Sequence, residues 1–280
     1  MNSIAKKNNS MKPFKQLWQE KEMNCRLGTT SFVIPGEIIS NLKYLKDIVE
    51  NVEVILFESE GFSNIPTTSD ILEMGIIARD SGLTFTIHLP RYGCACNPDR
   101  GNMEKSLEKW LRVIDLLEAL SPLGWIVHLE DSPGLNPPRD SWPSRDGWMD
   151  QCGKAIDKLC NRIEPDLLCV KTLNTGFNRL RSLVDEKKCS ICLDIGHLQS
   201  TGHDVAGWLD ECLAISRIIH LHGVRDDGRE NLDLGYLETG LLDDLVTGLK
   251  MDSNFSRILT LEVFSRKDLE KSMNVLNSVI

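Results

Sequence analysis

KKCSICLDIGHLQSTGHD, residues 187–204, contains a short apolar run that ends on Asp194 and is followed closely by His197 and His203. An apolar run of about four to eight residues between turn residues is typical of a buried strand. An acid at its end, with histidines directly after it, indicates that the strand leads into a polar site. Other apolar runs of the chain end in the same way.

Seven further runs of this kind divide the chain. They cover residues 26–32, 52–58, 83–88, 124–128, 167–171, 217–222 and 257–262. Helical patterns lie between them: residues 102–120 repeat apolar side chains at helical spacing, and residues 67–82 run from Ser69 as N-cap to Gly82 as C-cap. Eight strands that alternate with helices predict an α/β protein, a (β/α)8 TIM barrel. A doubly wound open sheet has less support, because no glycine-rich phosphate loop follows the first strand.

The composition is that of a globular protein, with 41% hydrophobic and 26% charged residues in a chain of 280. No apolar run approaches the roughly 20 residues needed to cross a bilayer, so we expect no membrane partner. The net charge is −9 without a stripe of lysine and arginine. That balance argues against a nucleic-acid partner, because phosphate contacts dominate such binding. The sequence carries no signal for a particular oligomeric state.

The cysteines and the N-terminus predict a location and a domain boundary. The nine cysteines are odd in number and scattered, which favours a reducing cytoplasm over a disulfide scaffold. Residues 1–24 are polar and lack an apolar signal core, so we expect a flexible extension there. Residues 25–280 are then a single TIM-barrel domain.

Ionisable residues end nearly all of the predicted strands: Glu58, His88, His128, Lys171, Asp194, His222 and Glu262. His220 lies two residues before His222, so both point to the same side of their strand. In a barrel, the carboxyl ends of all strands surround one mouth, where active sites lie. Taken alone, each of these residues is equally well explained as part of a site or as the first solvated position after a strand. The whole set favours one shared site.

The residue types in this set favour a divalent metal ion. Carboxylates and imidazoles are ligands for Zn²⁺ and Mn²⁺. The strongest cluster consists of Asp194, His197, His220 and Glu262. His203 lies further along its loop, so a structural role, or a role in orienting the metal ligands, explains it better than direct metal binding.

The strand ends also resemble those of a known group of proteins. The segments are TIHLP (86–90), IVHLE (126–130), CLDIGH (192–197), IIHLH (218–222) and LTLEVF (259–264). They look like the strand ends of xylose-isomerase-like TIM barrels, which include sugar isomerases, epimerases and the endonuclease IV group. More narrowly, RLGTTSFVIPGEIISNLKYL (26–45) and DIGHLQSTGHD (194–204) resemble the cobamide-remodelling phosphodiesterases.

The narrower resemblance implies metal-assisted hydrolysis of a phosphoester in the nucleotide loop of a cobamide, for corrinoid salvage. By resemblance, the metal ligands are His88, His128, Asp194, His197, His220 and Glu262. The candidate catalytic residues are Glu58, Lys171 and His203. The candidate substrate-binding residues are His222, Trp142 and Trp148. The two tryptophans lie in a proline-rich segment, 131–148, that we expect to form a lid over the mouth, although an anchored surface loop explains them equally well.

The chain departs from the family pattern at two places. The fifth strand reads VKTL (170–173) where relatives read like VENL, so Lys171 replaces a bridging carboxylate. The segment RENLDL (229–234) carries Glu230 and Asn231 where a histidine is expected. Lys171 can replace one cation, bind the substrate phosphate, or mark a barrel that only binds a corrinoid or another metabolite. A sugar isomerase or epimerase is a further alternative, against which the loss of the carboxylate counts.

Overall fold

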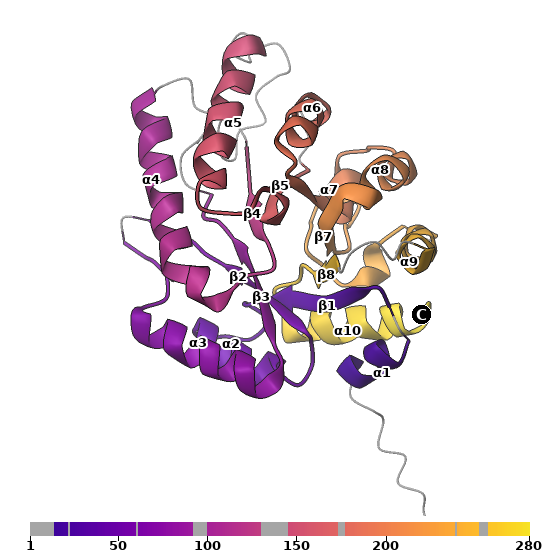
Figure 1. Ribbon diagram of the computed structural model, residues 1–280. Coiled ribbons are helices and arrows are strands. Elements are labelled where there is room, and N and C mark those ends of the chain that lie inside the picture. The colour runs from indigo at the N-terminus through magenta and orange to yellow at the C-terminus, as the bar shows by residue number, and fades with distance from the viewer. Residues whose placement is uncertain are drawn as a thin grey trace, which may run out of the picture.

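The computed structural model describes residues 14–21, 23–59, 61–91, 100–129, 145–172, 177–238, 240–251 and 257–280. Its centre is a closed barrel of parallel strands in sequential order, with the last strand paired to the first (Figure 1). The strands are β1 (Cys25–Thr30), β2 (Asn51–Ile55), β3 (Thr84–His88), β4 (Trp125–Val127), β5 (Leu168–Lys171), β6 (Ser190–Asp194), β7 (Ser216–Leu221) and β8 (Arg257–Leu261). The predicted TIM barrel is confirmed.

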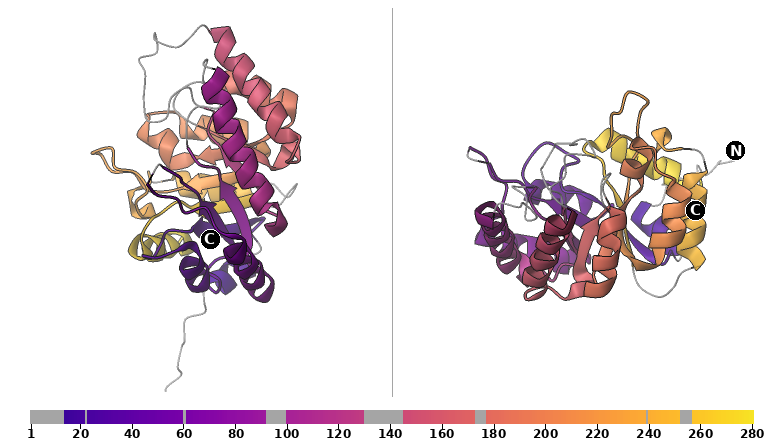
Figure 2. Two further views of the ribbon diagram at one scale, coloured as in Figure 1. Left: turned by 90° about the vertical axis from the view of Figure 1, so that its left-hand side faces the viewer. Right: turned by 90° about the horizontal axis from the view of Figure 1, so that it is seen from above.

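Helices surround the barrel on its outside, as the views of Figures 1 and 2 show. They are α1 (Phe14–Glu20), α2 (Ile38–Leu45), α3 (Thr68–Ser81), α4 (Arg100–Leu117), α5 (Arg145–Cys160), α6 (Phe177–Lys187), α7 (Ile195–Ser200), α8 (Val205–Cys212), α9 (Leu241–Met251) and α10 (Arg266–Asn277). Outward-facing strand residues such as Val52 and Val54 join helix residues such as Leu42 and Leu45 in the main hydrophobic core. Burial of this apolar surface holds the two layers together.

The ends of α3 show how local sequence sets a helix boundary. Thr67, not the predicted Ser69, is the N-cap: its side chain accepts a hydrogen bond from the Asp70 amide, and the Asp70 carboxylate accepts one from the Thr67 amide. This reciprocal pair satisfies two amides that have no partner within the helix. Gly82 ends the helix as predicted, with a φ of 69° that favours glycine.

The prediction of a flexible extension over residues 1–24 is wrong for residues 14–20, which form α1. Trp18 of this helix is buried, and its Nε1 donates a hydrogen bond to the Cys25 carbonyl at 2.9 Å. Lys15 Nζ donates to the Lys46 carbonyl at 3.0 Å. The helix therefore packs against the amino-terminal end of the barrel, where Trp18 is buried and Phe14 is partly buried against the core.

The barrel interior changes from apolar to polar toward its mouth. Ile126, Cys169, Cys192, Ile218 and Ile258 form a separate apolar cluster. Side chains alternate along a strand, so the residue two positions later points the same way. Those later residues are His128, Lys171, Asp194, His220 and Thr260. The strand pattern thus directs ionisable side chains into the carboxyl-terminal mouth, above an apolar floor.

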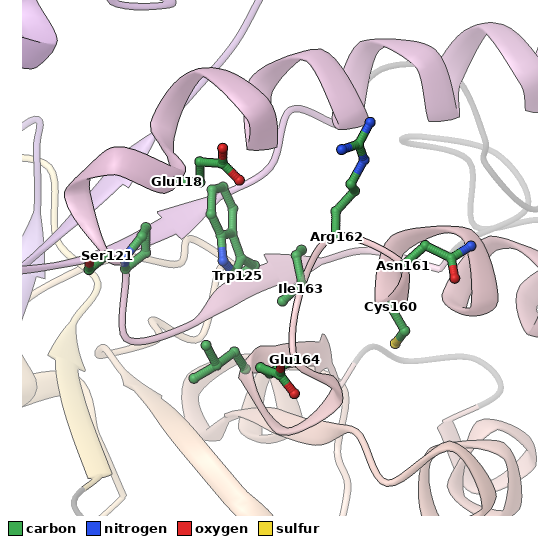
Figure 3. Close-up of a pocket in the computed structure, with 10 residues that line it drawn as sticks. Glu118, Ser121, Trp125, Cys160, Asn161, Arg162, Ile163 and Glu164 are labelled. Atoms are coloured by element: carbon green, nitrogen blue, oxygen red, sulfur yellow. The ribbon is translucent and has the colours of Figure 1, made fainter.

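A pocket of about 280 Å³ lies at the opposite, amino-terminal face of the barrel, between the start of β4 and the segment after α5 (Figure 3). Trp125, Cys160 and Glu164 are among its lining residues. This face of a TIM barrel generally serves stability rather than chemistry. No helix within the described residues is long and apolar enough to cross a membrane. The described cysteines are free thiols, and a cytoplasmic location stays a prediction.

Candidate functional site

Three buried side chains from three strands form an ion-pair cluster at the mouth. Lys171 ends β5, Asp194 ends β6, and Glu262 directly follows β8. Lys171 Nζ lies 2.9 Å from Asp194 Oδ2 and 3.1 Å from Glu262 Oε1. Burial opposes the charged form of the lysine, but the two carboxylates outweigh it and hold the pKa of Lys171 well above its ordinary value. The lysine is therefore a fixed positive charge that projects into the mouth.

His220 lies between two carboxylates. Its Nε2 is 2.7 Å from Glu53 Oε2, and its Nδ1 is 3.1 Å from Glu262 Oε2. Glu53, in the middle of β2, is fully buried, and its Oε1 accepts no hydrogen bond from the described residues. A buried carboxylate oxygen without a partner is costly unless a ligand completes it. Glu53 therefore belongs to the site, although its place within an apolar strand did not single it out.

His222, directly after β7, extends this set. Its Nε2 lies 3.2 Å from Asp194 Oδ1 and 3.9 Å from Glu262 Oε2. Its Nδ1 accepts a hydrogen bond from the Asn231 amide at 3.1 Å, and the Asn231 side chain donates to the Glu262 carbonyl at 3.2 Å. Asn231 lies in the segment where the resemblance predicts a histidine. Here it fixes the positions of His222 and Glu262.

The neighbouring strands β3 and β4 contribute a pair of histidines. His88 ends β3 and His128 directly follows β4, with their Nε2 atoms 3.0 Å apart. At this distance one ring donates a hydrogen bond and the other accepts it. Burial, reinforced by the charges of His128 and Lys171, lowers the pKa of His88 to about 3. His88 is therefore neutral near pH 7, the form that can bind a metal.

The DIGH motif (194–197) joins β6 to α7. Asp194 caps the helix by accepting a hydrogen bond from the His197 amide at 2.9 Å. The His197 side chain turns to Glu230, with its Nδ1 3.3 Å from Glu230 Oε1, and Ser200 Oγ donates to the same carboxylate. His197 thus lies at the edge of the site, paired with Glu230.

The GTTS motif (28–31) holds Glu262 in place. Thr29 Oγ1 donates to the Leu261 carbonyl at 2.8 Å, and Thr30 Oγ1 donates to the Val263 carbonyl at 2.7 Å. These two carbonyls flank Glu262 in the chain. The motif therefore acts on the position of the glutamate, by bonding the end of β1 to the end of β8.

Glu58 lies apart from the cluster, which corrects the prediction that it ends a strand at the mouth. β2 ends at Ile55, and Glu58 lies in the following loop. Its carboxylate is 2.7 Å from Arg112 Nη2 and 3.8 Å from Lys109 Nζ, both on α4. These ion pairs attach the loop to α4.

The remaining candidates also lie outside the cluster. The described ring contact of His203 is with Trp208, edge-on at a centroid distance of 5.9 Å. Trp148 is 2% exposed and belongs to the hydrophobic core, because the chain is already helical there and turns the ring inward. This corrects the prediction that Trp148 offers a lid surface to the substrate. Trp142 lies outside the described residues.

The donor atoms fit a divalent cation. Two groups of side chains each offer three ligand atoms that lie within 4.8 Å of one another. The first group is Glu53, His220 and Glu262, and the second is Asp194, His222 and Glu262. Metal ligation requires neutral histidines. With neutral histidines, the carboxylates of Glu53, Asp194 and Glu262 and the ammonium group of Lys171 have a net charge of two negative units. One divalent ion balances that charge. The choice of Zn²⁺ or Mn²⁺, and the ligand roles of these residues, stay predictions.

Gly196 allows His222 to approach Asp194. A Cβ at position 196 would lie 2.3 Å from His222 Cε1, closer than any real contact. We expect Gly196→Ala to displace the ring and weaken Zn²⁺ or Mn²⁺ binding roughly 10- to 100-fold in calorimetric titration. Gly75→Ala is the control, because its added Cβ meets only Leu120 at 3.9 Å. Equal affinities in the two variants would remove His222 from the ligand set.

The chain belongs to the xylose isomerase-like TIM barrel family, whose model matches residues 43–279. This match confirms the broader resemblance. No curated protein sequence matches the chain. The narrower resemblance to cobamide-remodelling phosphodiesterases stays a prediction.

Solved structures of epimerases share the fold at low sequence identity. A D-tagatose 3-epimerase-like protein has 16% identity and a TM-score of 0.69, over 91% of this chain and 96% of that one. The 3-keto-D-glucoside 4-epimerase of E. coli has 15% identity and a TM-score of 0.70, over 91% and 98%. The D-psicose 3-epimerase of Clostridium cellulolyticum has 13% identity and a TM-score of 0.68, over the same shares. At such identities the likeness shows the fold.

Proposed function

We propose that the protein is a divalent-metal-dependent phosphodiesterase that hydrolyses the phosphoester of the cobamide nucleotide loop. The observation that carries this proposal is the position of Lys171, whose ammonium group lies between Asp194 and Glu262. A phosphodiester is anionic, and a fixed ammonium group beside a divalent ion attracts it and stabilises charge that develops on its oxygens. The resemblance of residues 26–45 to the cobamide-remodelling family supports the substrate class.

The residues of the mouth have separate tasks in this reaction. The clustered carboxylates and histidines would hold a divalent ion, which when bound would polarise a phosphoryl oxygen and make water a stronger acid. Lys171 orients the phosphate through its charge. The neutral His88, hydrogen-bonded to His128, offers an uncharged imidazole to a metal ion or to the substrate. Asn231 and Thr30 keep His222 and Glu262 from rotating away.

A sugar isomerase or epimerase is the second candidate, and the comparisons with solved structures favour it. Three of the similar structures are named as epimerases or epimerase-like, and this chain covers nearly their whole length. The position of Lys171 argues against it. Inversion at a carbon needs a base that removes a proton, and a buried lysine held in its charged form by two carboxylates is a poor one.

A side-by-side assay separates the candidates. The purified protein is loaded with Zn²⁺ or Mn²⁺ and incubated with cobalamin, D-fructose or D-tagatose, and the products are followed by chromatography. We expect release of the lower-ligand nucleoside from cobalamin, abolished by a chelator, and no conversion of either sugar. Conversion of a sugar without cleavage of cobalamin would establish the second candidate instead. Binding of cobalamin without any turnover would identify a non-catalytic corrinoid binder.

A further inference from the structure

Three phenylalanine rings are in contact on the loops that follow β1 and β2. Phe57 and Phe62 are stacked, with centroids 5.1 Å apart and an interplanar angle of 19°. Phe32 lies against Phe57 at 5.4 Å and 36°. Both loops leave the carboxyl ends of their strands, so the rings lie on the rim of the mouth that holds Lys171. Phe62 is 58% exposed, which sets this group apart from the buried core.

The loop that carries Phe57 and Phe62 is held by its own hydrogen bonds. Asn64 Oδ1 accepts from the Phe57 amide at 2.7 Å, and Asn64 Nδ2 donates to the Ile55 carbonyl at 2.8 Å. The Ser59 amide donates to the Phe62 carbonyl at 2.7 Å. The ion pair of Glu58 with Arg112 fixes the loop to α4. The exposed ring is thus pre-positioned, so little entropy is lost when a ligand stacks on it.

Backbone pairing places the start of the loop that carries the rings beside the end of β3, which carries His88. Ile55 of β2 is the register partner of His88, and the Leu56 amide donates to the His88 carbonyl at 3.3 Å. Phe57 follows two residues after Ile55, about 7 Å further along the strand direction. Arg112 and Lys109 pair with the nearby Glu58 carboxylate, so this charge beside the rings is balanced within the described residues. An uncharged, planar ligand group suits this surface better than a cationic one.

We propose that Phe57 and Phe62 form an aromatic platform that stacks the planar base of a nucleotide whose phosphate faces Lys171. This inference rests on the proposed function and deepens it. A substrate with both an anionic phosphoester and a planar heteroaromatic base is held at two points, one electrostatic and one by stacking. The platform then selects substrates that still carry the base, because a ligand without it loses the second point of attachment.

The platform can be tested by binding alone, without turnover. Metal-free protein is titrated calorimetrically with cobalamin, which carries a benzimidazole nucleotide, and with cobinamide, which lacks it. We expect Phe62→Ala to weaken cobalamin binding about 10-fold, since stacking on an aromatic ring contributes about 1–3 kcal/mol per base. Cobinamide binding should not change, and Phe62→Trp should restore the affinity for cobalamin. Leu72→Ala is the matched control, because Leu72 is 67% exposed on α3.

The outcomes distinguish this inference from the proposed function. Cobalamin binding that depends on Phe62, without cleavage by the metal-loaded protein, keeps the platform and rejects the phosphodiesterase. Cleavage with equal cobalamin affinity in wild type and Phe62→Ala keeps the enzyme and rejects the platform. Failure of wild type to bind cobalamin more tightly than cobinamide also rejects the platform, since the base then contributes nothing.

Discussion

We expect Lys171→Glu to raise the divalent-metal content of the purified protein from about one ion per chain to about two. The lysine ammonium lies 2.9 Å from Asp194 Oδ2 and 3.1 Å from Glu262 Oε1, a position that a cation can also occupy. The substitution removes that charge and adds a carboxylate, so the local charge changes by two units. Elemental analysis after dialysis against Zn²⁺ or Mn²⁺ measures the result.

The metal-free variant should also be less stable. Removing one partner of a buried ion pair costs about 3–5 kcal/mol, and a third carboxylate beside Asp194 and Glu262 adds repulsion. We expect the melting temperature of the metal-free variant to fall by about 10 °C and to recover when metal is added. Lys171→Met is the control, since it removes the charge without adding a ligand and should leave a single ion. A glutamate variant with the wild-type metal content would show that Lys171 does not occupy a cation position.

If Lys171 instead holds only the substrate phosphate, the result is different. Metal content then stays constant in Lys171→Glu, while cobalamin binding weakens. A variant that matches wild type in both measurements would leave Lys171 without a role in the site. Metal stoichiometry and substrate affinity therefore have to be measured on the same preparations.

The barrel could be predicted because its sequence signals are local. Most strands are short apolar runs, and in several of them a polar residue faces inward where the strand meets the mouth. Cys192 and Asp194 on β6, or Ile218 and His220 on β7, show this two-residue step from floor to site. Reading where strands end was therefore enough to find most of the cluster.

Glu53 could not be found in this way, because it lies in the middle of its strand. Its partner His220 is 167 residues away in the chain, and only closure of the barrel brings the two together. Glu58 was wrongly included in the site, because the predicted strand ran three residues beyond Ile55, where β2 ends. A strand end displaced by an odd number of residues reverses the direction of the side chain. Acids inside apolar strands were the available signal, and Glu53 between Val52 and Val54 is the example.

Trp148 shows a different limit. A proline-rich segment that ends in tryptophan fits both a lid over the mouth and an anchor in the core. Whether Trp148 lies in a lid or in the core depends on which side of α5 faces the core. That orientation is set by packing within the hydrophobic core. Composition near a predicted mouth therefore did not locate substrate-binding residues. The exposed ring of Phe62, on a loop too short to attract notice, is the stronger candidate.

Removing the two carboxylates that contact Lys171 should abolish metal binding. Glu262 belongs to both groups of ligand atoms, and Asp194 is the other carboxylate that contacts Lys171. We expect Asp194→Ala combined with Glu262→Ala to lower the metal content to less than about one tenth of wild type, because each supplies an anionic oxygen. Elemental analysis after gel filtration gives the content. Glu58→Ala is the control, since that carboxylate pairs with Arg112 and should leave the metal in place.

The double variant leaves Lys171 buried without a counter-charge, which itself destabilises the fold. A second variant therefore combines Asp194→Asn, Glu262→Gln and Lys171→Met, which keeps the side-chain volumes and removes all three charges together. It should fold, as judged by circular dichroism, and still bind no metal, because neutral amides are weak ligands for Zn²⁺ and Mn²⁺. If this folded variant kept its metal, the ion would be held elsewhere, and the His88 and His128 pair would be the place to look. Loss of metal only in the unfolded double variant would equally reject the assignment of Asp194 and Glu262 as ligands.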